Sequence, residues 1–339
     1  MAAFKLGDVV IDKNSNDHCF VIAEAGSNHD RIKNNAFELI DTAAECGADA
    51  VKFQLFKAEK LYSKFVTRKI MDQIKHTELP NDWIPELMDR SKSQKILFLA
   101  TPFDYEAINY LDELGVEAFK WASGEITDIG LLSFAAQKLK PIIIATGMCS
   151  LSDIELAVRC VTQQKNNKIS LLHCISMYPS TPKDAHLRMM DTLDKAFDFP
   201  VGFSDHTLGT SVALASVARG AKILEKHFTL DKKLSSPDHP FALRPKELKS
   251  LINGVREVTQ SLGDRTKRMV RGEEPSSRTH RRSLIAKQAI RKGSKITKSM
   301  LTVKRPGTGI HPKFVDIVVG STARVMIKED QPLEWDMML

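Results

Sequence analysis

Two lysines lie inside short apolar runs, so a fold that buries those runs must bury the lysines as well. Lys52 interrupts the run AVKFQLF, and Lys120 interrupts AFKWASG. An unpaired buried ammonium is costly, so we expect both lysines to face an anion at the mouth of a pocket. Four hydroxyl side chains near the ends of similar runs could add hydrogen bonds: Thr101, Ser123, Ser176 and Ser204. This combination predicts a pocket for a small substrate that bears carboxylate and phosphate.

Two histidines, His206 and His227, end two further apolar runs, VGFSDH and ILEKH. Two imidazoles with open remaining positions suit a catalytic divalent cation such as Mn²⁺, Mg²⁺ or Co²⁺, whereas zinc more often has a third protein ligand. The alternative is that one histidine binds the anion and no metal is present, and the spacing does not separate these readings. Glu24 and Glu125 could be general acid or base groups, or acceptors for sugar hydroxyls.

The elements that must position these side chains are eight short apolar runs with amphipathic segments between them. Near-continuous apolarity is typical of strands buried on both faces of a parallel sheet. Eight strand–helix repeats within about 210 residues predict a (β/α)8 TIM barrel, whose active site lies at the carboxyl ends of the strands. The predicted strands are Phe20–Gly26, Ala50–Phe56, Ile96–Pro102, Ala118–Gly124, Pro141–Gly147, Ile169–Ser176, Val201–His206 and Ile223–Phe228.

The chain is longer than a barrel requires, and the remainder follows a last amphipathic helix at Pro245–Leu262. We expect a barrel domain over 1–262, a polar linker over 263–282 and a small module with short β segments over 283–339. The longest gap between strands, Lys57–Trp83, is expected to hold an extra helix or an active-site loop.

The net charge of +7 belongs to the tail rather than to the barrel. From Gly263 onward 17 basic and 8 acidic side chains give +9, which leaves −2 for the first 262 residues. This tail has no interleaved aromatic residues and no zinc-finger or helix-turn-helix pattern. We therefore expect a solvated surface and no nucleic-acid partner.

The cysteines and the hydropathy pattern indicate the compartment. The five cysteines are dispersed, without a Cys-x-x-Cys pair, which is typical of reduced thiols. No stretch approaches 18 apolar residues, and the first residues do not form a secretory signal. We expect a cytoplasmic protein with no membrane partner.

In their order along the chain, nine short segments resemble the sialic acid synthase family. These enzymes condense phosphoenolpyruvate with an N-acylated mannosamine-type sugar. A further segment, Arg281–Gly309, resembles the family's small C-terminal antifreeze-like (SAF) domain. The nine segments are IAEAGSNHD, VKFQ, ATPFD, KWASGE, ATGM, LHCISMYPS, GFSDHT, EKHFTLD and PDHPFAL.

The resemblance implies a role for each matching residue. Glu24 matches the catalytic carboxylate, and His206 and His227 would bind the metal, with His206 also counted as catalytic. Arg305 matches an arginine that one subunit offers to its partner's site, which implies a domain-swapped homodimer. Phosphoenolpyruvate would be held by Lys52, Thr101, Lys120, Ser123, Ser176, Ser204 and His206; the acceptor sugar would be held by Gln54, Glu125, Tyr178, Asp238 and Arg305. Ser176 departs from the pattern, because some members have Asn there.

The implied reaction joins C3 of phosphoenolpyruvate to the aldehyde of the open-chain sugar, which the metal polarises. Water then adds at C2, and phosphate leaves by C–O cleavage. The acceptor could be N-acetylmannosamine, its 6-phosphate, or a diacetamido-trideoxy sugar that leads to legionaminic or pseudaminic acid. We favour an unphosphorylated acceptor of surface-polysaccharide synthesis, because no extra phosphate clamp lies beside Gln54, Tyr178 and Asp238.

Two other readings remain. A synthase of 3-deoxy-octulosonate or heptulosonate phosphates would need a second basic cluster for its acceptor phosphate, and the C-terminal domain argues against it. A non-enzymatic protein would use the C-terminal module to bind carbohydrate or ice, or the basic tail to bind nucleic acid, and would tolerate substitutions at the barrel mouth. The lysines in apolar runs and the strand-end histidines disfavour this second reading.

Overall fold

Eight parallel strands form a closed barrel in the computed structural model, which describes residues 3–264 and 266–339. Around the barrel the order is β10-β3-β4-β5-β6-β7-β8-β9. This confirms the predicted TIM barrel, and each predicted run contains one strand. The strands are β3 (Phe20–Gly26), β4 (Ala50–Leu55), β5 (Leu97–Pro102), β6 (Phe119–Trp121), β7 (Ile142–Ala145), β8 (Ile169–Cys174), β9 (Val201–Asp205) and β10 (Ile223–His227).

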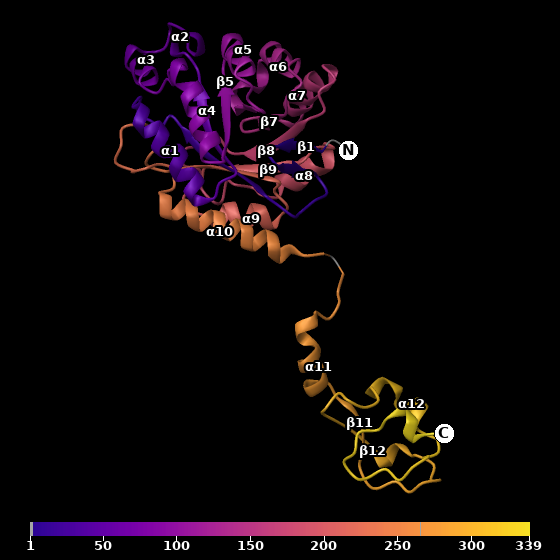
Figure 1. Ribbon diagram of the computed structural model, residues 1–339. Coiled ribbons are helices and arrows are strands. Elements are labelled where there is room, and N and C mark those ends of the chain that lie inside the picture. The colour runs from indigo at the N-terminus through magenta and orange to yellow at the C-terminus, as the bar shows by residue number, and fades with distance from the viewer. Residues whose placement is uncertain (1–2, 265) are drawn as a thin grey trace. The chain divides into compact units, whose positions relative to one another are not determined.

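At least one α-helix follows each barrel strand, and the eight helices named below pack around the barrel (Figure 1). Local sequence sets several of their ends. Asp104 and Ser150 cap α5 and α7 by accepting a backbone N–H from Ala107 and Asp153. Gly47 ends α1 with a left-handed φ of 85°. The helices are α1 (Lys33–Cys46), α4 (Ile84–Ser93), α5 (Tyr105–Glu113), α6 (Ile129–Ala136), α7 (Leu151–Gln163), α8 (Met189–Ala196), α9 (Ser211–Ala218) and α10 (Pro245–Leu262).

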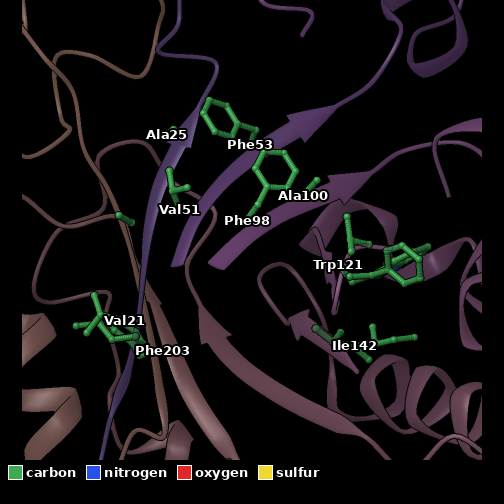
Figure 2. Packing of buried hydrophobic residues seen from close by; sticks show 14 of the residues in the cluster. Val21, Ala25, Val51, Phe53, Phe98, Ala100, Trp121, Ile142 and Phe203 are labelled. Carbon is green, nitrogen blue, oxygen red and sulfur yellow. The ribbon is translucent and has the colours of Figure 1, made fainter. Parts of the chain in front are cut away.

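Side chains along each strand alternate between the helix layer and the barrel interior. On β4, Val51 and Phe53 belong to the hydrophobic cluster between strands and helices, while Lys52 between them contacts charged groups inside the barrel. Figure 2 shows part of that outer cluster, in which the Phe53 and Phe98 rings stack with centroids 5.7 Å apart. Apolar side chains therefore anchor each strand from outside and leave the inward positions for chemistry.

A short hairpin contributes apolar side chains to the cluster inside the barrel. The strands β1 (Phe4–Leu6) and β2 (Val9–Ile11) pair antiparallel, and Phe4, Leu6 and Ile11 pack with inward residues such as Phe20.

In the long gap after β4 lie α2 (Ala58–Leu61), α3 (Arg68–Lys75) and the 3-10 helix Asn81–Trp83. After β6 comes the 3-10 helix Ser123–Thr127.

The chain divides into two compact units between Gly263 and Asp264. The second unit has its own core, which includes Leu284, Ile296 and Ile327, and its strands β11 (Ser283–Ala286) and β12 (Leu301–Lys304) pair antiparallel. Part of the predicted linker is helical, because α11 spans Glu274–His280 after a 3-10 turn at Arg271–Glu273. The unit also contains α12 (Val315–Val318) and 3-10 turns at Lys298–Met300, Pro312–Phe314 and Trp335–Met337. Within the described residues, no helix is both long and apolar enough to cross a membrane.

Candidate active site

Two lysines and two glutamates meet inside the barrel. The Lys52 Nζ atom lies 2.8 Å from Glu24 Oε2 and 3.7 Å from Glu225 Oε2, and Lys120 Nζ lies 3.6 Å from Glu225 Oε1. All four side chains are almost completely buried. Both lysines are therefore buried as predicted, but each already has a carboxylate partner of the protein.

The two glutamates differ in their electrostatic surroundings. Burial raises the pKa of Glu24 above its usual range, and this outweighs the nearby Lys52. Burial also opposes ionisation of Glu225, but Lys120 and Lys52 outweigh it and hold the pKa of Glu225 at about 2. The two carboxyl groups are thus shifted in opposite directions: Glu24 holds a proton more readily than an ordinary glutamate, while Glu225 remains a fixed negative charge.

The four predicted hydroxyl groups surround this cluster. Thr101 Oγ1 accepts a hydrogen bond from Lys52 Nζ at 3.1 Å, and Ser204 Oγ donates to Glu225 Oε1 at 2.8 Å. Ser123 Oγ accepts from the backbone N–H of Gly147 at 2.9 Å. Ser176 reaches the same glycine, because a β-carbon at Gly147 would lie 2.2 Å from Ser176 Oγ. The barrel therefore brings together the anion-binding residues predicted from strands β4 to β9.

The close approach at Gly147 leads to a prediction. In Gly147→Ala the new methyl group would displace Ser176 and press on Ser123, 3.0 Å away. For phosphoenolpyruvate, the anion that the family resemblance implies, we expect the KM to rise about tenfold, because small displacements in a binding site are costly. Gly124→Ala is the matched control, since its β-carbon would meet open space. Steady-state kinetics on both variants checks this, and an unchanged KM in Gly147→Ala would show that Ser176 and Ser123 do not bind the anion.

The two predicted metal ligands lie side by side, with ring centroids 5.5 Å apart. His206 Nδ1 lies 2.7 Å from the carbonyl oxygen of Ile175, which fixes the proton on Nδ1 and leaves Nε2 as a lone-pair donor. His227 Nδ1 is buried without a hydrogen-bond partner, 3.5 Å from Asp238 Oδ2. Burial lowers the pKa of His227 well below its usual value, so its imidazole is neutral. For His206, burial lowers the pKa, but the neighbouring Cys174 outweighs it and raises the pKa above its usual value. Two neighbouring imidazoles with available nitrogens fit a divalent cation, which binds imidazole in its neutral form.

No third protein ligand for a metal ion joins His206 and His227 among the described residues. Across residues 3–264 and 266–339, no group of three or more His, Cys, Asp and Glu side chains is arranged to hold a metal ion. A cation held by these two histidines would thus keep most of its coordination positions for water or substrate, which is the open geometry of a catalytic ion.

Several predicted acceptor-binding residues gather beside the histidines. Gln54 Nε2 donates to Glu24 Oε1 at 3.0 Å. Asp238 lies close to Gly26: a β-carbon added to this glycine, whose φ is 51°, would be 3.1 Å from Asp238 Oδ2. The half-exposed Tyr178 ring lies with its centroid 4.1 Å from that of His206.

Two further predicted sugar-binding residues are Glu125 and Arg305. Glu125 is in the 3-10 helix after β6, half-buried, and burial together with Asp128 raises its pKa. No hydrogen bond described for residues 3–264 joins its carboxylate to the cluster. Arg305 belongs to the second unit, where it is exposed directly after β12.

Three further residues line the site and were not among the predicted site residues: Glu225, Cys174 and Phe241. Cys174 Sγ lies 3.8 Å from His206 Nδ1, and the Phe241 and His227 rings are 5.1 Å apart. Glu225 had a usable signal, because it precedes His227 by two residues and therefore shares its inward face. Its neighbour Lys226 faces the other way and pairs with Asp205 at 2.8 Å, away from the cluster.

Comparisons with known proteins agree on one family. Residues 39–267 match the NeuB family, and residues 281–339 match the SAF domain. The chain is 41% identical to the N,N'-diacetyllegionaminic acid synthase of Campylobacter jejuni, with 92% of this chain and 97% of that protein covered. It is 39% identical to the enzyme of that name from Legionella pneumophila, with 96% of each covered. A crystal structure of N-acetylneuraminic acid synthetase from Leptospira borgpetersenii with citrate is 37% identical at a TM-score of 0.76, covering 81% of this chain and 95% of that chain.

Proposed function

The chain belongs to the NeuB family of phosphoenolpyruvate-condensing synthases, and from that premise we propose that it joins phosphoenolpyruvate to an open-chain N-acylated mannosamine-type sugar. The product is a nonulosonic acid for surface-polysaccharide biosynthesis. The observation that carries the proposal is the buried Lys52–Glu24–Glu225–Lys120 cluster beside His206 and His227. The two lysine ammonium groups, now paired with Glu24 and Glu225, could instead bind the carboxylate and the phosphate of a substrate.

The proposed reaction makes one C–C bond and one C–O bond and breaks one C–O bond. C3 of phosphoenolpyruvate attacks the aldehyde carbon, water adds at C2, and the bond between C2 and the phosphate oxygen breaks to release phosphate. Lys52 and Lys120 bind the anionic groups and fix the position of C3. Glu24, whose pKa burial raises, accepts the proton that the adding water loses and gives a proton to the former aldehyde oxygen, which becomes a hydroxyl group.

A divalent cation is the proposed cofactor, with Mn²⁺ as first choice and Mg²⁺ or Co²⁺ as alternatives. His206 and His227 would hold it, which the closeness of the two rings and the neutral imidazole of His227 support. When bound, such an ion acts as a Lewis acid on the aldehyde oxygen. We expect exhaustive chelation to abolish phosphate release and stoichiometric Mn²⁺ to restore it. Full activity at a metal content below one-tenth per chain, measured by mass spectrometry, would rule the metal out.

The acceptor has two candidates. N-Acetylmannosamine is the first. A diacetamido-trideoxyhexose that leads to legionaminic acid is the second, supported by the two relatives named N,N'-diacetyllegionaminic acid synthase at 41% and 39% identity. A panel of these sugars, the 6-phosphate, the pseudaminic acid precursor and a pentose phosphate, each with phosphoenolpyruvate and Mn²⁺, separates them by phosphate release and product mass. Absence of release with every sugar would contradict the proposed function.

We propose that the working enzyme is a domain-swapped homodimer, in which Arg305 of the second unit enters the partner's site to bind the sugar. The exposed position of Arg305 is compatible with such a role. Sedimentation should give twice the chain mass of 37.9 kDa. Mixed dimers of a Glu24→Gln chain and an Arg305→Ala chain should regain part of the activity that each lacks alone, and failure to do so would refute the exchange.

A cytoplasmic location is also part of the proposal. The five cysteines are free thiols, and four of them are buried, which suits a reducing compartment. Fractionation of cells that contain the protein checks this, and recovery in the extracellular fraction would contradict it.

A further inference from the structure

We propose that the buried pair Asp30–His239 is a positioning device that holds Asp238 at the sugar side of the active site and so sets the affinity for the acceptor. The inference rests on the proposed function and deepens it. Both residues lie outside the substrate-binding set described above. Asp238 belongs to a loop between β10 and α10, residues 231–243, which we call the acceptor loop.

Asp30 fastens this loop through three hydrogen bonds. Its Oδ2 atom lies 2.9 Å from His239 Nε2, and its Oδ1 atom accepts from Ser235 Oγ and from the backbone N–H of Ser236, both at 2.8 Å. One carboxylate therefore binds three residues of the acceptor loop, Ser235, Ser236 and His239, which lie more than 200 residues later in the chain. A charged acceptor makes these bonds stronger than neutral ones.

His239 extends the connection to the barrel. Its side chain is fully buried, and Nδ1 lies 2.6 Å from Thr229 Oγ1, just beyond the end of β10. Thr229 Oγ1 also lies 3.0 Å from the carbonyl oxygen of Asp231. The ring is thus held at both nitrogens between the turn after β3 and the end of β10, which leaves it one orientation.

Asp238 precedes His239, so the anchored ring determines where this carboxylate lies. Its Oδ2 atom is 3.5 Å from His227 Nδ1 and close to Gly26, which has no side chain to fill the space. Gly26 ends β3, and Asp30 lies four residues later in the same turn. That turn therefore contains both Gly26, which Asp238 approaches closely, and Asp30, whose carboxylate binds the acceptor loop.

The anchor and the anion cluster are separate. Among residues 3–264, the side-chain hydrogen bonds of Asp30 and His239 go to the acceptor loop and Thr229, and none goes to Lys52 or Lys120. Loss of the anchor should therefore weaken sugar binding and leave phosphoenolpyruvate binding intact. A general loss of stability would act on both substrates alike.

The experiment measures KM for each substrate and kcat in His239→Ala, His239→Gln and Asp30→Asn. We expect His239→Ala and Asp30→Asn to raise the acceptor KM about tenfold or more, with the phosphoenolpyruvate KM changed less than about threefold. Glutamine keeps a donor at the position of Nε2, so His239→Gln should recover most of the acceptor affinity. If His239→Ala does not fold, the other two variants decide the question.

Asp49→Asn is the matched control. Asp49 also pairs with a histidine, His18, at 2.9 Å and with Arg256. It lies just before β4, at the amino end of that strand, whereas the candidate active site lies at the carboxyl ends of the barrel strands. Asp49→Asn should lower Tm without changing the ratio of the two KM values. Equal changes in both KM values, or an unchanged acceptor KM in Asp30→Asn, would overturn the inference. A wild-type enzyme that releases no phosphate would instead overturn the proposed function.

Discussion

The Glu24→Gln enzyme is expected to lose turnover by about 10²–10⁴-fold, the usual contribution of a general acid or base, while it still binds phosphoenolpyruvate. Glutamine has the same shape and can still accept a hydrogen bond from Lys52, whose Nζ atom is 2.8 Å from the carboxylate. What the substitution removes is a titratable proton at a buried site, where burial raises the pKa of the acid. Proton transfer should therefore fail while the anion pocket persists.

Phosphate release under saturating substrates and calorimetric titration with phosphoenolpyruvate measure the two effects separately. Glu59→Gln is the control, because Glu59 is an exposed glutamate on α2 whose ion pair with Lys75 lies on the surface. It should keep both properties. Turnover near the wild-type rate in Glu24→Gln would exclude Glu24 from the chemistry, and lost phosphoenolpyruvate binding would reassign it to the anion pocket.

Lys120→Met is expected both to destabilise the barrel and to remove phosphoenolpyruvate affinity. The Lys120 ammonium lies 3.6 Å from Glu225 Oε1, and both side chains are nearly inaccessible to solvent. Removing the partner of a buried charge costs about 3–5 kcal/mol, and we expect a value toward the lower end, because Glu225 keeps Lys52 as its second counterion at 3.7 Å. We expect the KM for phosphoenolpyruvate to rise roughly 10²-fold, as for truncation of other buried charge contacts.

A second substitution separates the two effects. In Lys120→Met/Glu225→Gln the carboxylate that lost one of its two counterions is replaced by a neutral amide, so the free energy of unfolding should return part of the way to the wild-type value. Phosphoenolpyruvate affinity should stay low, because the ammonium that binds the substrate is still missing. Chemical denaturation and substrate titration test this, with Lys60→Met as an exposed-lysine control. Recovery of affinity in the double variant would show that Lys120 serves only to neutralise Glu225.

Local pattern alone predicted the strands and which of their residues face inward. Apolar runs such as AVKFQLF must be buried from both sides, and a polar residue within such a run is conspicuous because burial is costly. Lys52, Lys120, His206, His227 and Glu24 were all selected from the residues themselves, and the family resemblance assigned Gln54 and Asp238 to the acceptor sugar. The eight strands and the gathering of the anion-binding residues followed from the same signals.

Side chains that meet across the barrel could not be paired from the sequence. Lys120 on β6 and Glu225 on β10 lie on strands four positions apart in the closed ring of eight, so they meet only because the barrel closes. A sequence shows that a buried lysine needs an anion but not that the protein supplies one itself. The expectation that both lysines await a ligand was therefore incomplete, and Glu225 was left out of the predicted site.

The sequence by itself determined the barrel, its inward-facing residues and the presence of a separate C-terminal unit, because these depend on hydrophobic periodicity along the chain. The tertiary structure alone decided the counterions of the lysines and the anchoring of the acceptor loop. Asp30 and His239 are 209 residues apart, yet their side chains meet at 2.9 Å. Such contacts depend on strand register and barrel closure, which set distances that no local pattern contains.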